Sequence, residues 1–152
     1  MLTVLQKTFA FCCVVGMLSG CGGGSDKPEL KLNPVTGTVK VNGEAAKGVS
    51  VTFVPADGAG ADQVAASGTS DESGKYTLAV SSEEQGIPAG KYRVTFSRLL
   101  KPDGTALGPD EMAADAGAEN DLAPVYADSN QTPESADVPE GGGTFDFDIK
   151  KK

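Results

Sequence analysis

Short segments in which apolar and polar residues alternate constrain the fold of this chain more than any other feature. The clearest is 144–149, where Phe145, Phe147 and Ile149 alternate with two aspartates. A period of two places alternate side chains on opposite faces of a β-strand, so that one face is buried. We expect five further strands in segments bounded by turn residues, at 35–41, 49–55, 64–69, 75–80 and 92–96. The pattern predicts an all-β domain.

The turns between these segments are rich in glycine and proline, which number 20 and 9 among 152 residues. Asn42-Gly43 predicts a tight hairpin turn, because both residues tolerate a positive φ. Gly74 and Gly90 lie at further chain reversals, each two residues before an inward-facing tyrosine. Several strands with no long helix predict an antiparallel β-sandwich, with a partly open barrel as the alternative.

The alternation lapses over residues 99–143, which is too long for an ordinary loop. We predict a functional or semi-ordered irregular excursion there. Residues 110–117 are expected to form a short helix, with Pro109 near its start and acidic residues in its first turn. Val125 and Tyr126 are expected to fasten the excursion to the core.

The N-terminal residues predict an export signal. Lys7 adjoins an apolar run at 8–18, which is shorter than the roughly 20 residues that a transmembrane helix needs. Residues 18–21, Leu-Ser-Gly-Cys, resemble the lipobox of bacterial lipoproteins. This resemblance implies cleavage between Gly20 and Cys21 and acylation of Cys21, so that acyl chains hold the protein on a membrane.

Three regions follow from this assignment: a signal peptide at 1–20, the lipidated cysteine and a flexible tether at 21–33, and a β-sandwich domain at 34–152. The tether contains Gly and Ser and would reach roughly 20 Å. The lipoprotein resemblance favours the outer membrane over the inner one, because glycine and not aspartate follows Cys21. Cys12 and Cys13 would leave with the signal, so no internal disulfide is expected.

Six segments follow one another in a set order along the chain: Val35-Thr-Gly-Thr-Val39, Asn42-Gly43, 48–55, 69–78, 87–96, and a closing Gly-rich turn with a Phe-x-Phe strand at 141–149. The order of these segments resembles the carboxypeptidase regulatory-like, or transthyretin-like (prealbumin-like), domain, especially the small bacterial lipoproteins that carry one copy. The resemblance implies a Greek-key sandwich of about seven strands that acts as an accessory or adhesive module.

Composition excludes several function classes. The chain has no histidine, so Ser-His-Asp triads, His-ligated zinc and imidazole proton shuttles are absent. A formal net charge of −8 disfavours nucleic acid, whose phosphates need clustered Lys and Arg. We therefore expect neither an enzyme nor a bound cofactor.

Acidic residues supply the only candidate metal sites. Asp71 and Ser73, before Gly74, resemble a fragment of a calcium loop, but a third spaced carboxylate and a bidentate Glu are missing. We therefore predict a turn at this point, with Asp71 and Ser73 as weak metal candidates. A second acidic set is predicted to be solvated loop charge, with weak divalent-cation binding as the alternative: Asp110, Glu111, Asp115, Glu119 and Asp121.

Charges near the C-terminus have simpler expected roles. Asp146 and Asp148 face outward on the closing strand, where they are expected to discourage pairing between sheet edges. The lysines at 150–152 are predicted to be a solvated tail, with contact to anionic lipid as the alternative.

These observations together predict a non-enzymatic, lipid-anchored protein of the cell envelope. Its β-sandwich would bind an envelope protein or a glycan, or act as a structural module. The alternatives are an accessory subunit of an envelope transport or secretion system and a calcium-dependent glycan-binding module.

Overall fold

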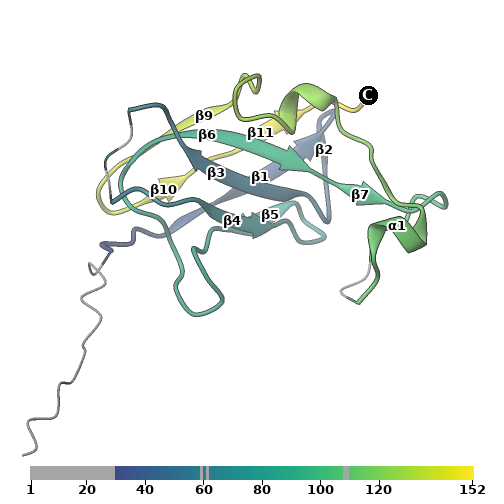
Figure 1. Cartoon of the computed structure of the whole chain (residues 1–152), viewed down its shortest axis with the longest axis horizontal. Coiled ribbons are helices and arrows are strands. Elements are labelled where there is room, and N and C mark those ends of the chain that lie inside the picture. Colours follow the sequence, from purple (N-terminus) through teal and green to yellow (C-terminus); the bar gives the residue numbers. More distant parts are fainter. Residues whose placement is uncertain (1–29, 59, 61, 108–109) are drawn as a thin grey trace, which may run out of the picture.

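The computed structural model describes residues 30–58, 60, 62–107 and 110–152 (Figure 1). The predicted signal peptide, its cleavage point between Gly20 and Cys21, and most of the tether lie outside the described residues. The described chain is nearly all β, with two main sheets and a small third one, which confirms the predicted β-sandwich. Within it, no helix is long and apolar enough to cross a membrane.

The first sheet is built around β1 (Val35–Val41). On one side β1 pairs antiparallel with β2 (Glu44–Ala45) and β5 (Lys75–Thr77), and on the other it pairs parallel with β10 (Gly143–Thr144) and β11 (Phe147–Ile149). The parallel pairing departs from the antiparallel arrangement that we expected. A long connection separates β1 from β11 in the sequence, and only a short hairpin requires antiparallel neighbours.

The second sheet contains β4 (Ala66–Thr69), β3 (Ser50–Pro55), β6 (Gly90–Ser97) and β9 (Ser135–Val138), in that order, and all its pairs are antiparallel. In the first sheet β2 and β5 share one side of β1, and β10 and β11 share the other. The five short strands of the first sheet thus fill three positions, β1 and one on either side of it, and with the four strands of the second sheet these make up the predicted number of about seven.

Aromatic side chains from both sheets meet in one core. The ring centroid of Phe53 lies 6.0 Å from that of Tyr92, 5.9 Å from that of Phe145 and 6.3 Å from that of Phe147. The rings of Phe96 and Phe147 pack edge to face at 5.1 Å. The residues predicted to face inward are buried, with two exceptions that are half-buried at the edge of the core: Phe145, and Val80, which lies beyond the end of β5 at Thr77. Their burial removes apolar surface from water, which is the main favourable contribution to folding.

Between β10 and β11 side chains take over part of the strand pairing. The Tyr76 hydroxyl donates to the Phe145 carbonyl over 2.7 Å, and Asp146 Oδ1 accepts from the backbone N–H and the hydroxyl of Thr38, each at 2.7 Å. A Cβ at Gly37 would lie 1.8 Å from the Phe145 carbonyl oxygen, so only glycine fits there. Burial raises the pKa of Tyr76, which keeps its hydroxyl a hydrogen-bond donor.

The outward aspartates of the closing strand have partners within the domain. Asp146 binds Thr38 of β1, and Asp148 Oδ1 accepts the backbone N–H of Gly43 over 2.9 Å. Lys150 lies 3.6 Å from the Asp148 carboxylate. Beyond the expected effect on edge pairing, these carboxylates thus join the closing strand to β1 and to its turn.

Region 99–143 contains more regular structure than we expected. It includes β7 (Leu99–Leu100), α1 (Ala113–Ala116), β8 (Glu119–Asn120), η1 (Pro124–Tyr126) and the whole of β9. The predicted extent of the excursion is therefore wrong at its end, because β9 is a strand of the second sheet. With only four residues, between Pro133 and Pro139, β9 is too short for its alternation to stand out.

Two smaller expectations for this region are confirmed. The short helix predicted at 110–117 forms at Ala113–Ala116, and Tyr126 is buried with its ring 6.1 Å from that of Phe96 in an edge-to-face arrangement. Val125, by contrast, is 37% exposed. Tyr126 is thus the residue of this pair that fastens the connection to the core.

The folded domain includes Asn33, which we assigned to the tether. Backbone hydrogen bonds join Asn33 and Ile87 at 2.8 and 3.0 Å, and Asn33 Oδ1 accepts the N–H of Gly141 over 2.8 Å. Asn33 is buried, with 4% of its surface exposed. A single amide that links two distant loops leaves no periodic signal in the sequence.

Candidate functional site

A small unit, which we name the distal lobe, projects from one end of the sandwich and consists of the described residues 98–107 and 110–121. It contains β7, α1 and β8, and β7 and β8 form the two-stranded third sheet. Figure 1 shows it at the right, at the end of the molecule opposite to the purple start of the described chain. The two ends of the sandwich therefore differ: the chain enters at one, and the distal lobe is presented at the other.

An ion pair between Arg98 and Asp121 closes the base of the lobe. Arg98 Nε donates to Asp121 Oδ1 over 2.8 Å, and Arg98 Nη2 donates to Asp121 Oδ2, which makes the pair bidentate. The Arg98 side chain is 10% exposed and that of Asp121 is 21% exposed. Burial alone would raise the pKa of Asp121, but the hydrogen bonds and charge of Arg98, helped by Lys151, lower it below its usual value.

Backbone bonds join the same base to the C-terminal residues. Asn120 Oδ1 accepts the N–H groups of Arg98 and Leu122, each over 3.2 Å, and Lys152 N donates to the Asp121 carbonyl over 3.1 Å. Lys151 forms an isolated bridge with Leu122. The lysine tail is therefore exposed, but its backbone is held against the end of the lobe.

The outer part of the lobe depends on surface polar contacts. Asp103 Oδ1 accepts the hydroxyl of Thr105 at 2.6 Å and its N–H at 2.9 Å, and these bonds lower the pKa of Asp103. Lys101 Nζ lies 3.0 Å from a carboxylate oxygen of Glu111. The four-residue helix α1 has no buried residue. This part of the lobe thus lacks the apolar interior that stabilises the sandwich.

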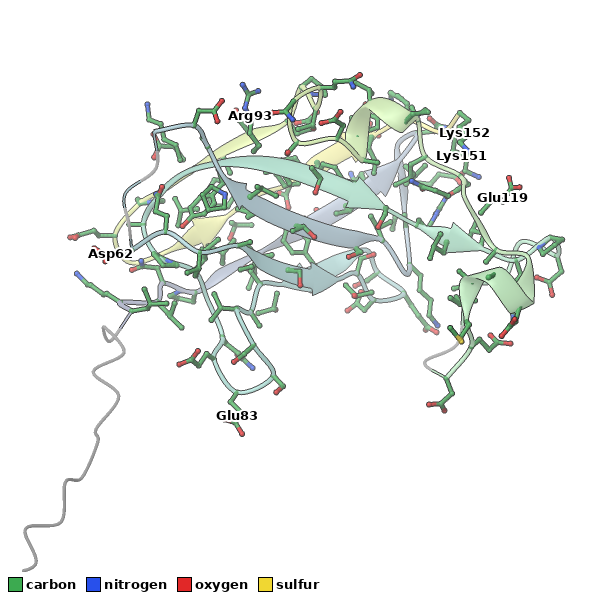
Figure 2. The ribbon with its side chains drawn as sticks, viewed as in Figure 1. Asp62, Glu83, Arg93, Glu119, Lys151 and Lys152 are labelled. Atoms are coloured by element: carbon green, nitrogen blue, oxygen red, sulfur yellow. The ribbon has the colours of Figure 1, made fainter. Side chains whose placement is uncertain are left out.

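Between the lobe and the C-terminal residues lies a cleft of about 600 Å³. Its walls combine apolar groups of Leu100 and Pro102 with charged side chains, and Figure 2 shows Glu119, Lys151 and Lys152 grouped on this side of the molecule. Such a surface can bind a partner through apolar contact and hydrogen bonds to charged groups. Its other lining residues are Lys101, Gly104, Gly117, Asn120 and Asp121.

The acidic set that we predicted in this region does not gather into one site. Glu111 pairs with Lys101 and Asp121 pairs with Arg98, while Glu119 lies on the cleft. Among the described residues, no three Asp, Glu, His or Cys side chains are arranged to hold a metal ion. The set includes Asp110 and Asp115, both exposed.

The weak metal candidates Asp71 and Ser73 belong to a turn, as predicted. Asp71 Oδ1 accepts the Ser73 hydroxyl at 2.7 Å, the Ser73 N–H at 2.8 Å and the Lys75 N–H at 3.0 Å. The hydroxyl bond first, and then the backbone bonds, lower the pKa of Asp71. Gly74 completes the turn with a φ of 76°. One carboxylate oxygen is thus occupied by the chain itself.

Other interior polar groups have structural partners. The Ser70 hydroxyl donates to the Ala46 carbonyl over 2.6 Å and accepts the Val49 N–H, and the Thr132 hydroxyl donates to the Val94 carbonyl. In the described part of the chain, every buried side-chain nitrogen or oxygen has a hydrogen-bond partner. These groups therefore contribute to the stability of the fold.

Sequence reasoning missed Arg98, although one signal could have identified it. Arg98 continues the inward phase of Tyr92, Val94 and Phe96, so the alternation places a cation at a position where a buried side chain belongs. A buried cation requires a carboxylate partner. Asp121 was singled out as one of five acidic residues, but nothing in the spacing joins it to Arg98.

No family model matches the chain, and no curated protein matches it. Among solved structures, the major pilin subunit of Bacillus cereus is similar, with a TM-score of 0.41 and 17% identity over 80% of this chain and 30% of the pilin. A 9R-lipoxygenase from Cyanothece is similar with a TM-score of 0.35 and 12% identity over 82% of this chain and 17% of the enzyme. This chain spans less than a third of either protein, and neither likeness bears on its function.

Proposed function

We propose that this protein is a lipid-anchored component of the bacterial cell envelope whose β-sandwich presents the distal lobe to a partner. Acyl chains on Cys21 would hold it on a membrane, with the outer membrane favoured. The supporting observation is the position of the lobe at the opposite end of the sandwich from the start of the described chain (Figure 1). Attachment before residue 30 would therefore leave the lobe and its cleft accessible.

A binding role is supported over catalysis by the chemistry of the side chains. The whole sequence lacks histidine, and the buried polar groups of the described residues are all hydrogen-bonded within the fold. The cleft offers ammonium groups, one unpaired carboxylate at Glu119 and apolar walls. This combination suits recognition of a protein segment or a glycan by contact, without a bond being made or broken.

The family likeness belongs to the same proposal. Strand order and turn residues over 34–96 resemble the carboxypeptidase regulatory-like domain of small bacterial lipoproteins. In such a module the sandwich would act as a scaffold, and the lobe would supply the binding residues specific to this protein. Loops held on a rigid scaffold are where binding residues concentrate.

A photo-crosslinking residue in the lobe tests this function in intact cells. Met112 is 70% exposed, so a crosslinker there would reach a bound partner, while the same residue at Glu83, on a loop away from the lobe (Figure 2), serves as the matched control. We expect a larger crosslinked species, with protein or glycan attached, from Met112 only. Equal products from both positions, or none from Met112, would contradict the proposal.

A further inference from the structure

The turn between β1 and β2 consists of Asn42 and Gly43. Their φ angles are 54° and 86°, and Val41 pairs with Glu44 across the turn, which are the features of a two-residue type I′ hairpin. Asn42 is the only non-glycine residue with a positive φ in the described chain, and it is exposed. The turn therefore combines a favourable hairpin geometry with an Asn-Gly dipeptide that water can reach.

An Asn-Gly dipeptide is prone to deamidation by a well-defined chemical route. The backbone nitrogen of Gly43 can lose its proton and attack Cγ of Asn42, and ammonia then leaves to give a five-membered succinimide. Water opens this ring to aspartate or isoaspartate, so the net change consumes one water and releases one ammonia. Glycine in the second position favours the attack because no side chain hinders the nitrogen.

The fold holds both backbone nitrogens of this turn against β11. Asn42 N–H donates to the Ile149 carbonyl over 2.9 Å, and Gly43 N–H donates to Asp148 Oδ1 over 2.9 Å. A carboxylate that accepts this proton opposes its loss, because deprotonation would place a second negative charge beside the first. In a type I′ turn the ψ of the first residue is near 30°, which also keeps the glycine nitrogen away from the asparagine side chain.

We propose that Asn42 is a deamidation site that the folded turn keeps unreactive, and that Asp148 is the residue that protects it. Reaction then requires the turn to open and the Gly43 N–H to leave Asp148. This inference is independent of the proposed binding function, since it rests on a turn and two hydrogen bonds whose residues do not line the cleft.

Modification at this position would affect more than the turn. Isoaspartate adds a methylene group to the backbone, which a two-residue turn cannot absorb without losing its register. The bonds to Asp148 and Ile149 would then be lost at the end of β11. The residues that follow β11 pair with the base of the distal lobe through Leu122 and Asp121. Protection of Asn42 thus also preserves the support of the lobe.

Peptide mass spectrometry of the full chain tests the proposal. The protein is incubated at mildly alkaline pH, and conversion of Asn42 is followed in the tryptic peptide 41–47. We expect conversion to be at least about tenfold slower in the folded protein than in the same chain held in denaturant. The variant Asp148→Ala should convert about fivefold faster than the wild type, because one charge-assisted hydrogen bond no longer opposes opening.

Two further variants distinguish specific protection of the turn by Asp148 from a general destabilisation of the closing strand. Asp146→Ala removes a similar bond from the closing strand, to Thr38 and not to the turn, and should leave the rate at Asn42 unchanged. Asp148→Asn keeps an acceptor without its charge and should fall between wild type and Asp148→Ala. An Asp148→Ala rate equal to or below that of the wild type would overturn the proposal, as would equal acceleration by Asp146→Ala.

Discussion

The sandwich and the distal lobe are stabilised in different ways. In the sandwich, both sheets contribute buried side chains to one aromatic and aliphatic core, and each buried residue reinforces its neighbours. In the lobe, the helix has no buried residue, and the contacts are ion pairs and a turn at the surface, with one partly buried ion pair at its base. The sandwich therefore depends on buried apolar surface, whereas the lobe depends on polar contacts near its surface, so we expect changes in the lobe to cost less stability than changes in the core.

The largest expected effect is in the sandwich, at Gly37. The variant Gly37→Ala places a Cβ 1.8 Å from the Phe145 carbonyl oxygen, so β1 and the closing strand must separate. We expect a loss of about 4 kcal/mol or more in the free energy of unfolding, measured by denaturant titration. Gly60→Ala is the matched control, because no atom lies within 4 Å of its Cβ position and its φ is not positive. A small effect at Gly37 would show that the two strands are not closely paired there.

A second pair of variants compares neighbouring apolar residues on the two sides of Arg98. Phe96→Ala should destabilise by about 3–5 kcal/mol, because its buried ring contacts those of Phe147 and Tyr126. Leu99→Ala should change stability by less than about 0.5 kcal/mol, since Leu99 is 37% exposed. Equal losses in denaturant titrations would mean that the lobe shares the core of the sandwich.

Removal of Arg98 should affect the lobe before it affects the sandwich. Arg98→Ala leaves Asp121 partly buried without its partner, at a cost of about 2 kcal/mol. Hydrogen exchange should accelerate within 99–121 and stay nearly unchanged in β1 and β3. Lys101→Ala, which removes a more exposed ion pair with Glu111, is the control and should cost less than about 0.5 kcal/mol. Uniform acceleration across both regions would contradict this separation.

The smallest expected effect is the pH dependence of the base of the lobe. The pKa of Asp121 is lower in the folded protein than its usual value, so its ionised form contributes stability above the unfolded pKa of about 3.9. That contribution is lost as the pH falls through the lower, folded pKa. Exchange in the lobe should therefore accelerate in acid more in the wild type than in Asp121→Asn. The same acid response in both proteins would assign the effect to other carboxylates.

The sequence predicts the sandwich well because alternation is a local and repeated signal. Tyr92, Val94 and Phe96 face the core as their spacing indicates, and the hairpin turn at Asn42 forms as its residue types require. β9 was missed because a strand of four residues shows too little periodicity. The parallel direction of β11 relative to β1 was missed because it depends on the path of the long connection between them, which no local pattern indicates.

The candidate site was less predictable, because its contacts join residues that no local pattern relates. Arg98 continues the alternation of buried residues in β6, whereas Asp121 lies in a region without alternation. Only the folded chain brings the two side chains together. The same is true of Lys151 and Lys152, which looked like a simple tail but line the cleft. Each long-range polar pair depends on the tertiary fold and not on a repeated local pattern, so its two partners cannot be predicted from their spacing in the sequence.

The most direct test of the account is the intact mass of the protein extracted from membranes, compared with that of Cys21→Ser. Attachment at Cys21 is the premise from which the outward presentation of the lobe follows. We predict a wild-type mass equal to residues 21–152 plus acyl chains, and an unprocessed, unacylated variant. An unmodified wild-type chain that retains its first residue would contradict the lipid anchor and, with it, the proposed role of the distal lobe.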